Sequence, residues 1–290
     1  MTSPKGLLLA GGTGSRLYPL TSVVNKHLLP VFDKPLIYYS LSTLMFSGAR
    51  EIAVITNPND LDQFKQLLGV GAQIGLEISY VPQPSPRGIG DAIARCSTFL
   101  GNERCVVVLG DNLFHGSGFG MSLERVGRDE SATVFAYSVA DPSPYAVVDF
   151  DSRGLPSILV EKPVTPRSNW AVPGLYFLPI GAAEEARQLP VSDRGESEVT
   201  DLNRMYMQAG ILEVLRASRG SMWMDVGTPD RLFAASMYVE SIAQRQGMSI
   251  SCPEEVALRK GWITEDAFAL LAHESPSSLY GDYLRSLIES

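Results

Sequence analysis

The sequence has few cysteines and histidines and no long apolar run. Its three cysteines, Cys96, Cys105 and Cys252, lack the spacing of a metal site and cannot all pair as disulfides. Its three histidines lie far apart, which argues against a zinc site. No apolar run approaches the roughly 18 residues of a membrane-spanning helix, and Met1–Gly6 leads directly into an apolar segment without a signal peptide. We therefore expect a cytoplasmic protein with reduced thiols and no membrane partner.

Positively charged residues are also fewer than negatively charged ones. The 290 residues include 24 Lys and Arg against 32 Asp and Glu, a formal net charge of −8. Such a balance argues against wholesale binding of nucleic acid or an anionic membrane, so any phosphate-binding charge must be local. The length allows one large α/β domain or a domain with an appended lobe, and a hydrophobic content of 45% is enough for a large core.

A glycine-rich loop follows an apolar segment near the N-terminus. Residues Gly6–Ala10 suit a buried parallel strand, and Gly11–Gly14 contains three glycines. Glycine has no Cβ, so its N–H group can approach a phosphate closely. Arg16 and Lys26 add fixed positive charge. The segment therefore predicts a site for a polyphosphate.

Two other types of glycine-rich loop do not fit. A P-loop requires a Gly-Lys pair before Ser or Thr, and none occurs here. A Rossmann loop requires a third glycine where this chain has Leu17, and Pro19 disfavours the helix that would follow. Asp33 lies about 20 residues on, where a ribose-binding acid would be, but it falls in a turn. A nicotinamide-dependent dehydrogenase is therefore disfavoured.

Strand and helix patterns alternate in the first half of the chain. We expect strands at 51–56, 76–81 and 105–109 and helices at 36–47, 57–69 and 91–99. This rhythm predicts an α/β fold with a Rossmann-like, mostly parallel sheet flanked by helices. After residue 130 we expect strands with short connections, at 132–137, 146–150, 158–161, 172–177, 211–217 and 221–225, with helices at 182–188 and 199–209.

The tail is helical, at 229–246, 253–260, 264–273 and 278–288. We therefore predict a core over residues 1–228, which includes sugar-binding insertions. A helical C-terminal lobe over 229–290 is expected to contribute contacts between subunits.

Two aspartates follow apolar segments and are candidate ligands for Mg²⁺. Asp111 comes just after the strand that ends at Leu109, and Asp225 precedes Gly227. Ligands of such sheets lie at the carboxyl ends of the strands, so Asp111 is expected beside the glycine-rich loop. Mg²⁺ prefers one or two carboxylates together with phosphate oxygens and water. The alternative for Asp225 is to cap the helix that begins near Pro229, and spacing alone slightly favours it.

Two more segments carry candidate substrate contacts. Glu161 and Lys162 end a strand, where lysine suits a phosphate monoester and glutamate suits sugar hydroxyls. The alternative is a surface ion pair. Gln83–Gly88 is a stiff, proline-rich loop that can contact a pyrimidine edge through Gln83. Without further context an ordinary proline turn is the simpler interpretation.

Together these motifs resemble the sugar-1-phosphate nucleotidylyltransferases, and within them the glucose-1-phosphate thymidylyltransferases of the short bacterial deoxysugar-pathway type. The resemblance rests on G-G-x-G-[ST]-R-L followed by K-x-L-L-P-V, and on Leu109–Asn112, Glu161–Pro163 and Trp223–Thr228, and it covers nearly the whole chain. It implies transfer of a thymidylyl group from dTTP to glucose 1-phosphate with Mg²⁺, giving dTDP-glucose and pyrophosphate, by a homotetramer. UTP in place of dTTP, or another hexose 1-phosphate, stays open. An inert nucleotide-sugar sensor is disfavoured because the charged residues are all retained.

The resemblance also implies a role for each matching residue. The triphosphate would be held by Gly11, Gly12, Thr13, Gly14, Ser15 and Arg16. Lys26 would stabilise the α-phosphate and the leaving pyrophosphate, while Gln83 and Gly88 would contact thymine. Mg²⁺ would bind Asp111 and Asp225. The sugar phosphate would contact Tyr145, Ala146, Glu161, Lys162 and Val172. An effector site for an end-product nucleotide sugar would include His115, Gly116, Arg219, Gly220, Ser251, Glu255 and Arg259.

Three positions depart from the family's usual pattern. Asp91 stands where glutamine is usual, Ala146 where glycine follows the sugar-pocket tyrosine, and His115 where tyrosine is usual. The first two changes motivate the hypothesis that a modified or epimeric hexose 1-phosphate is preferred, because one methyl group in a pocket shifts discrimination by about 1–3 kcal/mol. The third predicts altered feedback control.

Overall fold

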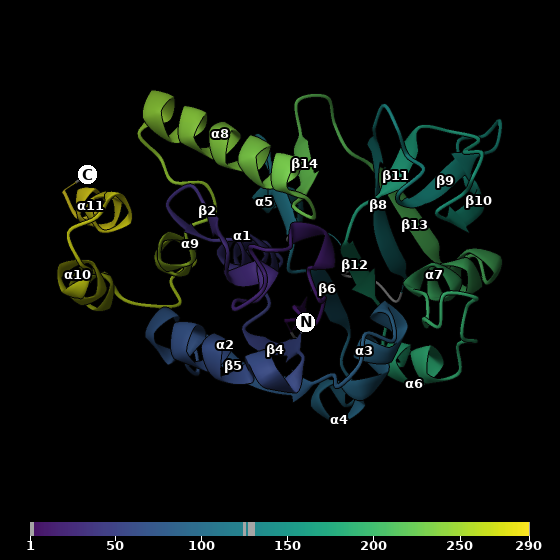
Figure 1. Ribbon diagram of the computed structural model, residues 1–290, viewed down its shortest axis with the longest axis horizontal. Helices are drawn as coiled ribbons and strands as arrows, with labels where there is room; N and C mark the ends of the chain where they lie inside the picture. The colour runs from purple at the N-terminus through teal and green to yellow at the C-terminus, as the bar shows by residue number, and fades with distance from the viewer. Residues whose placement is uncertain (1–2, 124–125, 127–130, 290) are drawn as a thin grey trace.

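One mixed β-sheet runs through the molecule (Figure 1). The computed structural model describes residues 3–123, 126 and 131–289. The strand order is β10-β9-β11-β8-β12-β6-β1-β4-β5, and β13 pairs with β8 outside this path. The predicted α/β class is therefore confirmed.

The parallel part of the sheet comes from the N-terminal strands, as the sequence predicts. The central strand β1 (Lys5–Leu9) lies between β4 (Glu51–Thr56) and β6 (Cys105–Leu109), parallel to both, and β5 (Glu77–Pro82) extends this part beyond β4. The next strand, β12 (Leu175–Leu178), is antiparallel to β6. Beyond it most pairings are antiparallel, so the complete sheet is mixed.

Most of the remaining strands and helices were expected close to where they lie, but the short helix α5 was not expected. The other strands of this sheet are β8 (Ala132–Ser138), β9 (Ala146–Phe150), β10 (Pro156–Glu161), β11 (Trp170–Val172) and β13 (Leu212–Arg216). The helices are α1 (Ile37–Phe46), α2 (Leu61–Leu68), α3 (Ile89–Arg95), α4 (Ser97–Leu100), α5 (Phe119–Leu123), α6 (Ala182–Arg187), α7 (Val199–Gln208), α8 (Pro229–Gln246), α9 (Pro253–Arg259), α10 (Glu265–Glu274) and α11 (Leu279–Ser286).

Both faces of the parallel strands are buried. Leu7 and Leu8 are neighbours on β1 and are both inaccessible to solvent, yet they belong to different hydrophobic clusters. Successive side chains of a strand point to opposite faces, so one face packs on the cluster that includes α3, α6 and α7, and the other on the cluster that includes α1 and α9. This explains the continuous apolar runs in the sequence.

Two predicted elements are each divided in the structure. The strand expected at 172–177 becomes β11 and β12, separated by Pro173 and Gly174, because proline has no N–H to donate to a ladder. The helix expected at 91–99 becomes α3 and α4, with Cys96 between them outside helical geometry at φ −88° and ψ 9°. Three short strands were not expected: β2 (Pro30–Val31), β3 (Lys34–Pro35) and β7 (Asn112–His115).

The C-terminal helices begin with α8, which runs across the top of Figure 1. Ala235 and Val239 of α8 pack with Leu113 and Val226 in one buried cluster, so this helix lies directly on the core. The division of the chain at residues 228 and 229 stays a prediction. All three cysteines are free and buried. Within the described residues, no helix combines the length and apolar character needed to cross a membrane.

Candidate active site

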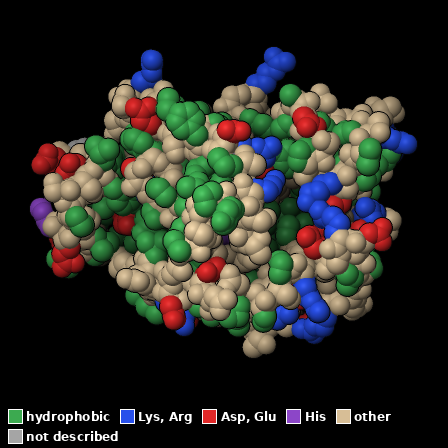
Figure 2. All heavy atoms as spheres, viewed as in Figure 1, with side chains coloured by type: hydrophobic (Ala, Val, Ile, Leu, Met, Phe, Trp, Pro, Cys, Tyr) green, Lys and Arg blue, Asp and Glu red, His purple; other side chains and the backbone are tan. Residues whose placement is uncertain are grey.

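A cavity of about 390 Å³ lies between Arg16, which follows the glycine-rich loop, and the strands β6, β9, β10 and β14 (Met222–Asp225). It brings together most of the predicted catalytic and sugar-binding residues, although they are dispersed along the sequence. Its lining includes Arg16, Asp111, Tyr145, Ala146, Glu161, Lys162, Val172 and Asp225. On the face shown in Figure 2, lysine and arginine side chains stand on both sides of a hollow.

The glycine-rich loop packs closely around Lys26. A Cβ on Gly12 would lie 3.1 Å from Cε and 3.3 Å from Nζ of Lys26, so the missing side chain makes room for the ammonium group. Gly14 adopts the left-handed conformation at φ +64°, which favours glycine. Arg16 is exposed, and a Cβ on Gly227 would lie only 2.7 Å from its Nη2. Gly227 thus allows the guanidinium to approach the end of β14.

Asp111 and Lys26 form a nearly buried ion pair. Lys26 Nζ donates to Asp111 Oδ2 at 2.5 Å, and the two side chains are 13% and 15% exposed. Burial alone would raise the pKa of Asp111, but the Lys26 charge and hydrogen bonds from Lys26 and Asn112 lower it to about 2. The carboxylate is therefore ionised at neutral pH.

Asp225 is brought beside Asp111 by the pairing of two short strands. Residues 112 and 225 are opposite each other in the antiparallel β7–β14 pair, and Val226 N–H donates to the Asp111 carbonyl at 2.7 Å. Burial raises the pKa of Asp225, as does the charge of Asp111, while Tyr145 and Arg231 oppose this shift. Tyr145 Oη donates to Asp225 Oδ1 at 2.7 Å, and the Arg231 guanidinium donates to both carboxylate oxygens.

The capping alternative for Asp225 is wrong in this structure. The N-cap residue of α8 is Thr228, and no side chain caps that end. The Asp225 carboxylate instead contacts Tyr145 and Arg231. Arg231 was missed by the sequence analysis, because it lies in the first turn of a surface helix and no motif marks it.

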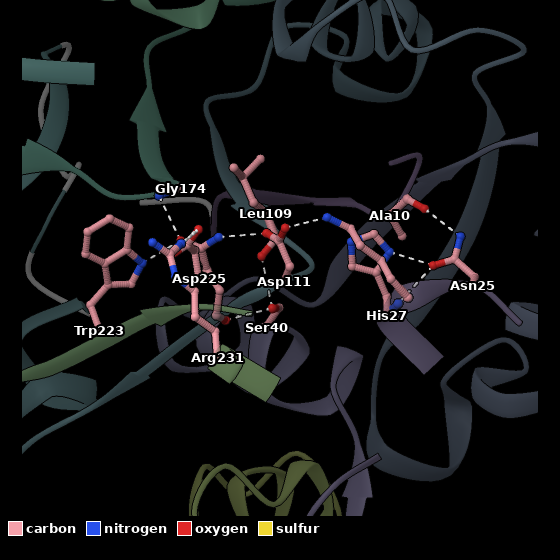
Figure 3. A network of polar contacts seen from close by, with 12 residues as sticks. Ala10, Asn25, His27, Ser40, Leu109, Asp111, Gly174, Trp223, Asp225 and Arg231 are labelled. Atoms are coloured by element: carbon pink, nitrogen blue, oxygen red, sulfur yellow. Dashed lines mark hydrogen bonds and ion pairs between the residues drawn. The ribbon is translucent and has the colours of Figure 1, made fainter. Parts of the chain in front are cut away.

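Polar contacts behind the two aspartates hold them in place (Figure 3). Asn112 Oδ1 accepts from Trp223 Nε1 at 2.7 Å and from Gly174 N–H at 3.0 Å. Ser40 Oγ donates to the carbonyls of Leu109 and Asn112. These bonds join α1, β6, β7, β14 and the turn before β12. Sequence patterns do not mark Ser40 or Trp223 as supports, because their partners are far away in the chain.

His27 follows Lys26 and is fully enclosed. Its Nδ1 lies 2.7 Å from Asn25 Oδ1, and Asn25 Nδ2 donates to the Ala10 carbonyl at 3.2 Å and to Asp60 Oδ2 at 2.6 Å. Burial, with the nearby Lys26 charge, lowers the pKa of His27 to about 3. A neutral imidazole therefore packs against Gly110, where a Cβ would lie 2.7 Å from the His27 Cδ2.

Glu161 and Lys162, where the sugar phosphate is expected to bind, are not an isolated ion pair. Glu161 accepts from Thr200 Oγ1 at 2.5 Å and from Arg194 Nη2 at 3.2 Å, whereas Lys162 Nζ lies 3.8 Å away. Lys162 has a left-handed backbone at φ +42°, and its N–H donates to the Tyr145 carbonyl at 3.0 Å. A residue other than glycine in this region is strained, so the surrounding contacts hold it there.

The proline-rich loop Gln83–Gly88 lies against Gly11, the first glycine of the glycine-rich loop. A Cβ on Gly11 would lie 3.0 Å from Gln83 Oε1, and Gln83 Nε2 donates to the Gly88 carbonyl at 3.2 Å. Gly88 adopts φ +94°, and a Cβ there would lie 2.5 Å from the Ser197 carbonyl oxygen. The structure therefore brings the two residues expected to contact a base close to the expected phosphate loop.

The predicted effector residues are divided between two places. His115, Gly116, Ser251, Glu255 and Arg259 line a separate cavity of about 440 Å³. His115 Nδ1 lies 2.7 Å from Tyr238 Oη, and burial lowers the pKa of His115. Arg219 and Gly220 do not line this cavity and lie in the turn between β13 and β14.

Comparison with protein families identifies one that matches most of the chain. The model of the family described as nucleotidyl transferase matches residues 5–242. The match includes the glycine-rich loop, both aspartates and the Glu161–Lys162 pair.

Several similar proteins have the same name. Glucose-1-phosphate thymidylyltransferase of Mycobacterium tuberculosis (strain CDC 1551 / Oshkosh) is 47% identical over 285 residues, covering 98% of this chain and 99% of the relative. The enzyme of the same name from Xanthomonas campestris pv. campestris (strain B100) is 47% identical over 288 residues, covering 99% and 98%.

Solved structures resemble the fold. A Bacillus anthracis protein assigned as a glucose-1-phosphate thymidylyltransferase, crystallised with sucrose, matches with a TM-score of 0.74 and 38% identity, over 81% of this chain and 94% of that one. A UDP-glucose pyrophosphorylase complexed with UDP-glucose matches with a TM-score of 0.69 and 27% identity, over 83% and 99%.

Proposed function

The chain belongs to the nucleotidyl transferase family, and we propose that it transfers the thymidylyl group of dTTP to glucose 1-phosphate, giving dTDP-glucose and pyrophosphate. The observation that carries this proposal is the convergence of Arg16, Asp111, Lys162 and Asp225 on one cavity, with Lys26 bound to Asp111. The identity of 47% to enzymes of this name, over almost the whole chain, supports the same substrates.

The charges around the cavity suit an in-line displacement at phosphorus. An oxygen of the sugar phosphate forms a bond to the α-phosphorus of dTTP, while the bond from that phosphorus to the bridging oxygen of the β-phosphate breaks. The attacking oxygen is already anionic, so no general base is needed. Catalysis then consists of positioning and electrostatic stabilisation. Lys162 positions the sugar phosphate, and Arg16 and Lys26 stabilise charge on the triphosphate.

Asp111 and Asp225 are suited to hold Mg²⁺. Both carboxylates face the cavity, and the negative charge of Asp111 raises the pKa of Asp225. Two carboxylates completed by phosphate oxygens and water are a ligand set that Mg²⁺ accepts. Among the described residues, no group of three or more His, Cys, Asp or Glu side chains is placed to hold a metal ion. When bound, Mg²⁺ would neutralise charge on the reacting phosphates.

A homotetramer is part of the same proposal, because the resemblance implies one. The cavity around His115 and Glu255 is the proposed effector site. Sedimentation of the purified protein would measure the number of subunits. A monomer would contradict this part of the proposal and leave the chemistry unaffected.

Pyrophosphate release measures the proposed reaction directly. The enzyme is incubated with Mg²⁺ and glucose 1-phosphate and with dTTP, UTP, CTP, ATP or GTP in parallel. We expect the highest kcat/KM with dTTP. A preference for UTP would support the uridylyl alternative, and no release with any nucleotide would contradict the proposed function.

Two matched lysine variants test the sugar-phosphate site. Lys162→Ala should raise the KM for glucose 1-phosphate, because it removes a positive charge from the cavity. Lys65→Ala, at a comparably exposed position on α2, should leave this KM unchanged; the two side chains are 47% and 54% exposed. Equal effects of the two variants would contradict the role of Lys162.

A further inference from the structure

The side-chain amide of Gln83 is held by two acceptors of the protein. Gln83 is 7% exposed. Its Nε2 donates to Asp91 Oδ2 at 2.8 Å and to the Gly88 carbonyl at 3.2 Å. A primary amide has two N–H donors, so both are used within the protein. Asp91 in turn accepts from Arg95 Nε at 2.7 Å, which holds its carboxylate in place from α3.

The acceptor oxygens of Asp91 and Gly88 determine which way the amide faces. Rotating the amide by half a turn would put its carbonyl oxygen against the Asp91 carboxylate and the Gly88 carbonyl. The oxygens of Gln83, Asp91 and Gly88 would then face one another with no hydrogen atom between them, at a position that is nearly buried. Leaving buried acceptors without a donor is costly, so the observed orientation is preferred. Gln83 Oε1 consequently points toward Gly11, where a Cβ would lie 3.0 Å away.

We propose that Asp91 is a positioning residue for base recognition: it holds Gln83 so that only the amide oxygen faces the nucleobase. This inference rests on the proposed function, in which Gln83 contacts the base. An oxygen acceptor matches the N3–H donor of thymine or uracil. Cytosine has an unprotonated N3, so its lone pair would face the oxygen. The Asp91–Gln83 pair therefore selects thymine and uracil against cytosine.

This geometry explains the effect of having aspartate at position 91, where the family usually has glutamine. A neutral glutamine at position 91 can present either its oxygen or its NH₂ group to Gln83, so it would define the amide less strictly. Aspartate is acceptor-only when ionised. Asp91 lies behind the base contact, which makes it a determinant of the nucleotide and not of the sugar.

The test compares dTTP with dCTP, which share the 2′-deoxyribose and differ in the base. Asp91→Ala removes the acceptor, so the amide can turn and donate to cytosine N3. We expect the ratio of kcat/KM for dTTP to that for dCTP to fall by about 10- to 100-fold. The loss with dTTP should appear in KM more than in kcat. Asp91→Leu, which keeps the branched shape and the number of side-chain heavy atoms, should behave similarly and provides a folded comparison if the alanine variant is unstable.

Two controls separate positioning from a merely structural effect. Asp91→Asn keeps an oxygen that can accept from both Gln83 and Arg95, so it should retain most of the dTTP preference. Arg95→Ala removes the charge partner but leaves the Asp91–Gln83 bond, and should also retain it. An unchanged dTTP to dCTP ratio in folded Asp91→Ala and Asp91→Leu would overturn the inference. Inactivity of the wild-type enzyme with every nucleotide would instead overturn the proposed function.

Discussion

Replacing Asp111 by asparagine should remove most of the activity without removing the side chain's volume. Asp111 is the carboxylate that pairs with Lys26 at 2.5 Å, and it is 15% exposed. Removing one preorganised electrostatic contact costs about 2.7–4 kcal/mol of transition-state stabilisation, which corresponds to a 10²- to 10³-fold loss in kcat. We therefore expect Asp111→Asn to release pyrophosphate at least about 100-fold more slowly than the wild type at saturating dTTP, glucose 1-phosphate and Mg²⁺.

The same variant should also affect folding, which has to be measured separately. The asparagine leaves the charge of Lys26 without its partner, and breaking a buried pair costs up to about 3–5 kcal/mol. Thermal unfolding by circular dichroism gives the folded fraction at the assay temperature, to which kcat is then normalised. Asp62→Asn is the matched control, because it makes the same chemical change on a side chain that is 98% exposed. It should leave both kcat and stability unchanged.

One result would refute the reasoning outright. If folded Asp111→Asn retains a kcat within a few-fold of the wild type, Asp111 neither holds a metal ion nor balances charge at the reacting phosphates. A lowered melting temperature with full activity would give Asp111 a structural role only.

Four further predictions concern stability, substrate and control. His27 has a folded pKa of about 3, below its ordinary value of 6.5, so the unfolded chain binds an extra proton between these values. The free energy of unfolding should fall by about 2 kcal/mol from pH 7 to pH 5, and denaturant titrations of His27→Gln should lack this component. Gly174→Ala should lower stability by about 1–3 kcal/mol, because its Cβ would lie 2.4–2.8 Å from the Leu109 side chain; an unchanged denaturation midpoint would contradict this. Ala146→Gly should shift relative kcat/KM toward glucose 1-phosphate and away from the galactose, mannose and glucosamine 1-phosphates; a clear glucose preference of the wild type would end the hypothesis of a modified sugar. His115→Tyr should increase inhibition by dTDP-rhamnose in steady-state assays, and equal inhibition of the two proteins would separate His115 from feedback control.

The parallel half of the sheet follows from local sequence. The runs at Glu51–Thr56 and Cys105–Leu109 were predicted with the bounds that β4 and β6 have. They are apolar enough to be buried on both faces, and helical patterns between them leave only parallel crossover connections. The antiparallel part of the sheet was harder to predict from the sequence. Pro173 and Gly174 separate two strands within a single apolar run, because proline has no N–H to donate to a ladder.

The sequence by itself determined the chemical groups of the site. Glycines after an apolar strand, Arg16, Lys26 and two aspartates at strand ends are recognisable because each motif is local. Their roles follow from charge and from the resemblance to a known family, without any knowledge of distances.

Only the tertiary structure decided how these groups are paired. Asn112 and Trp223 are 111 residues apart, yet their bond and the β7–β14 ladder bring Asp225 beside Asp111. Arg231 pairs with Asp225 from a helix with no motif, and Asp91 accepts a hydrogen bond from the Gln83 amide. Strand pairing and side-chain orientation depend on the relative placement of distant segments. Local propensity and spacing do not specify that placement, because it results from packing the whole core.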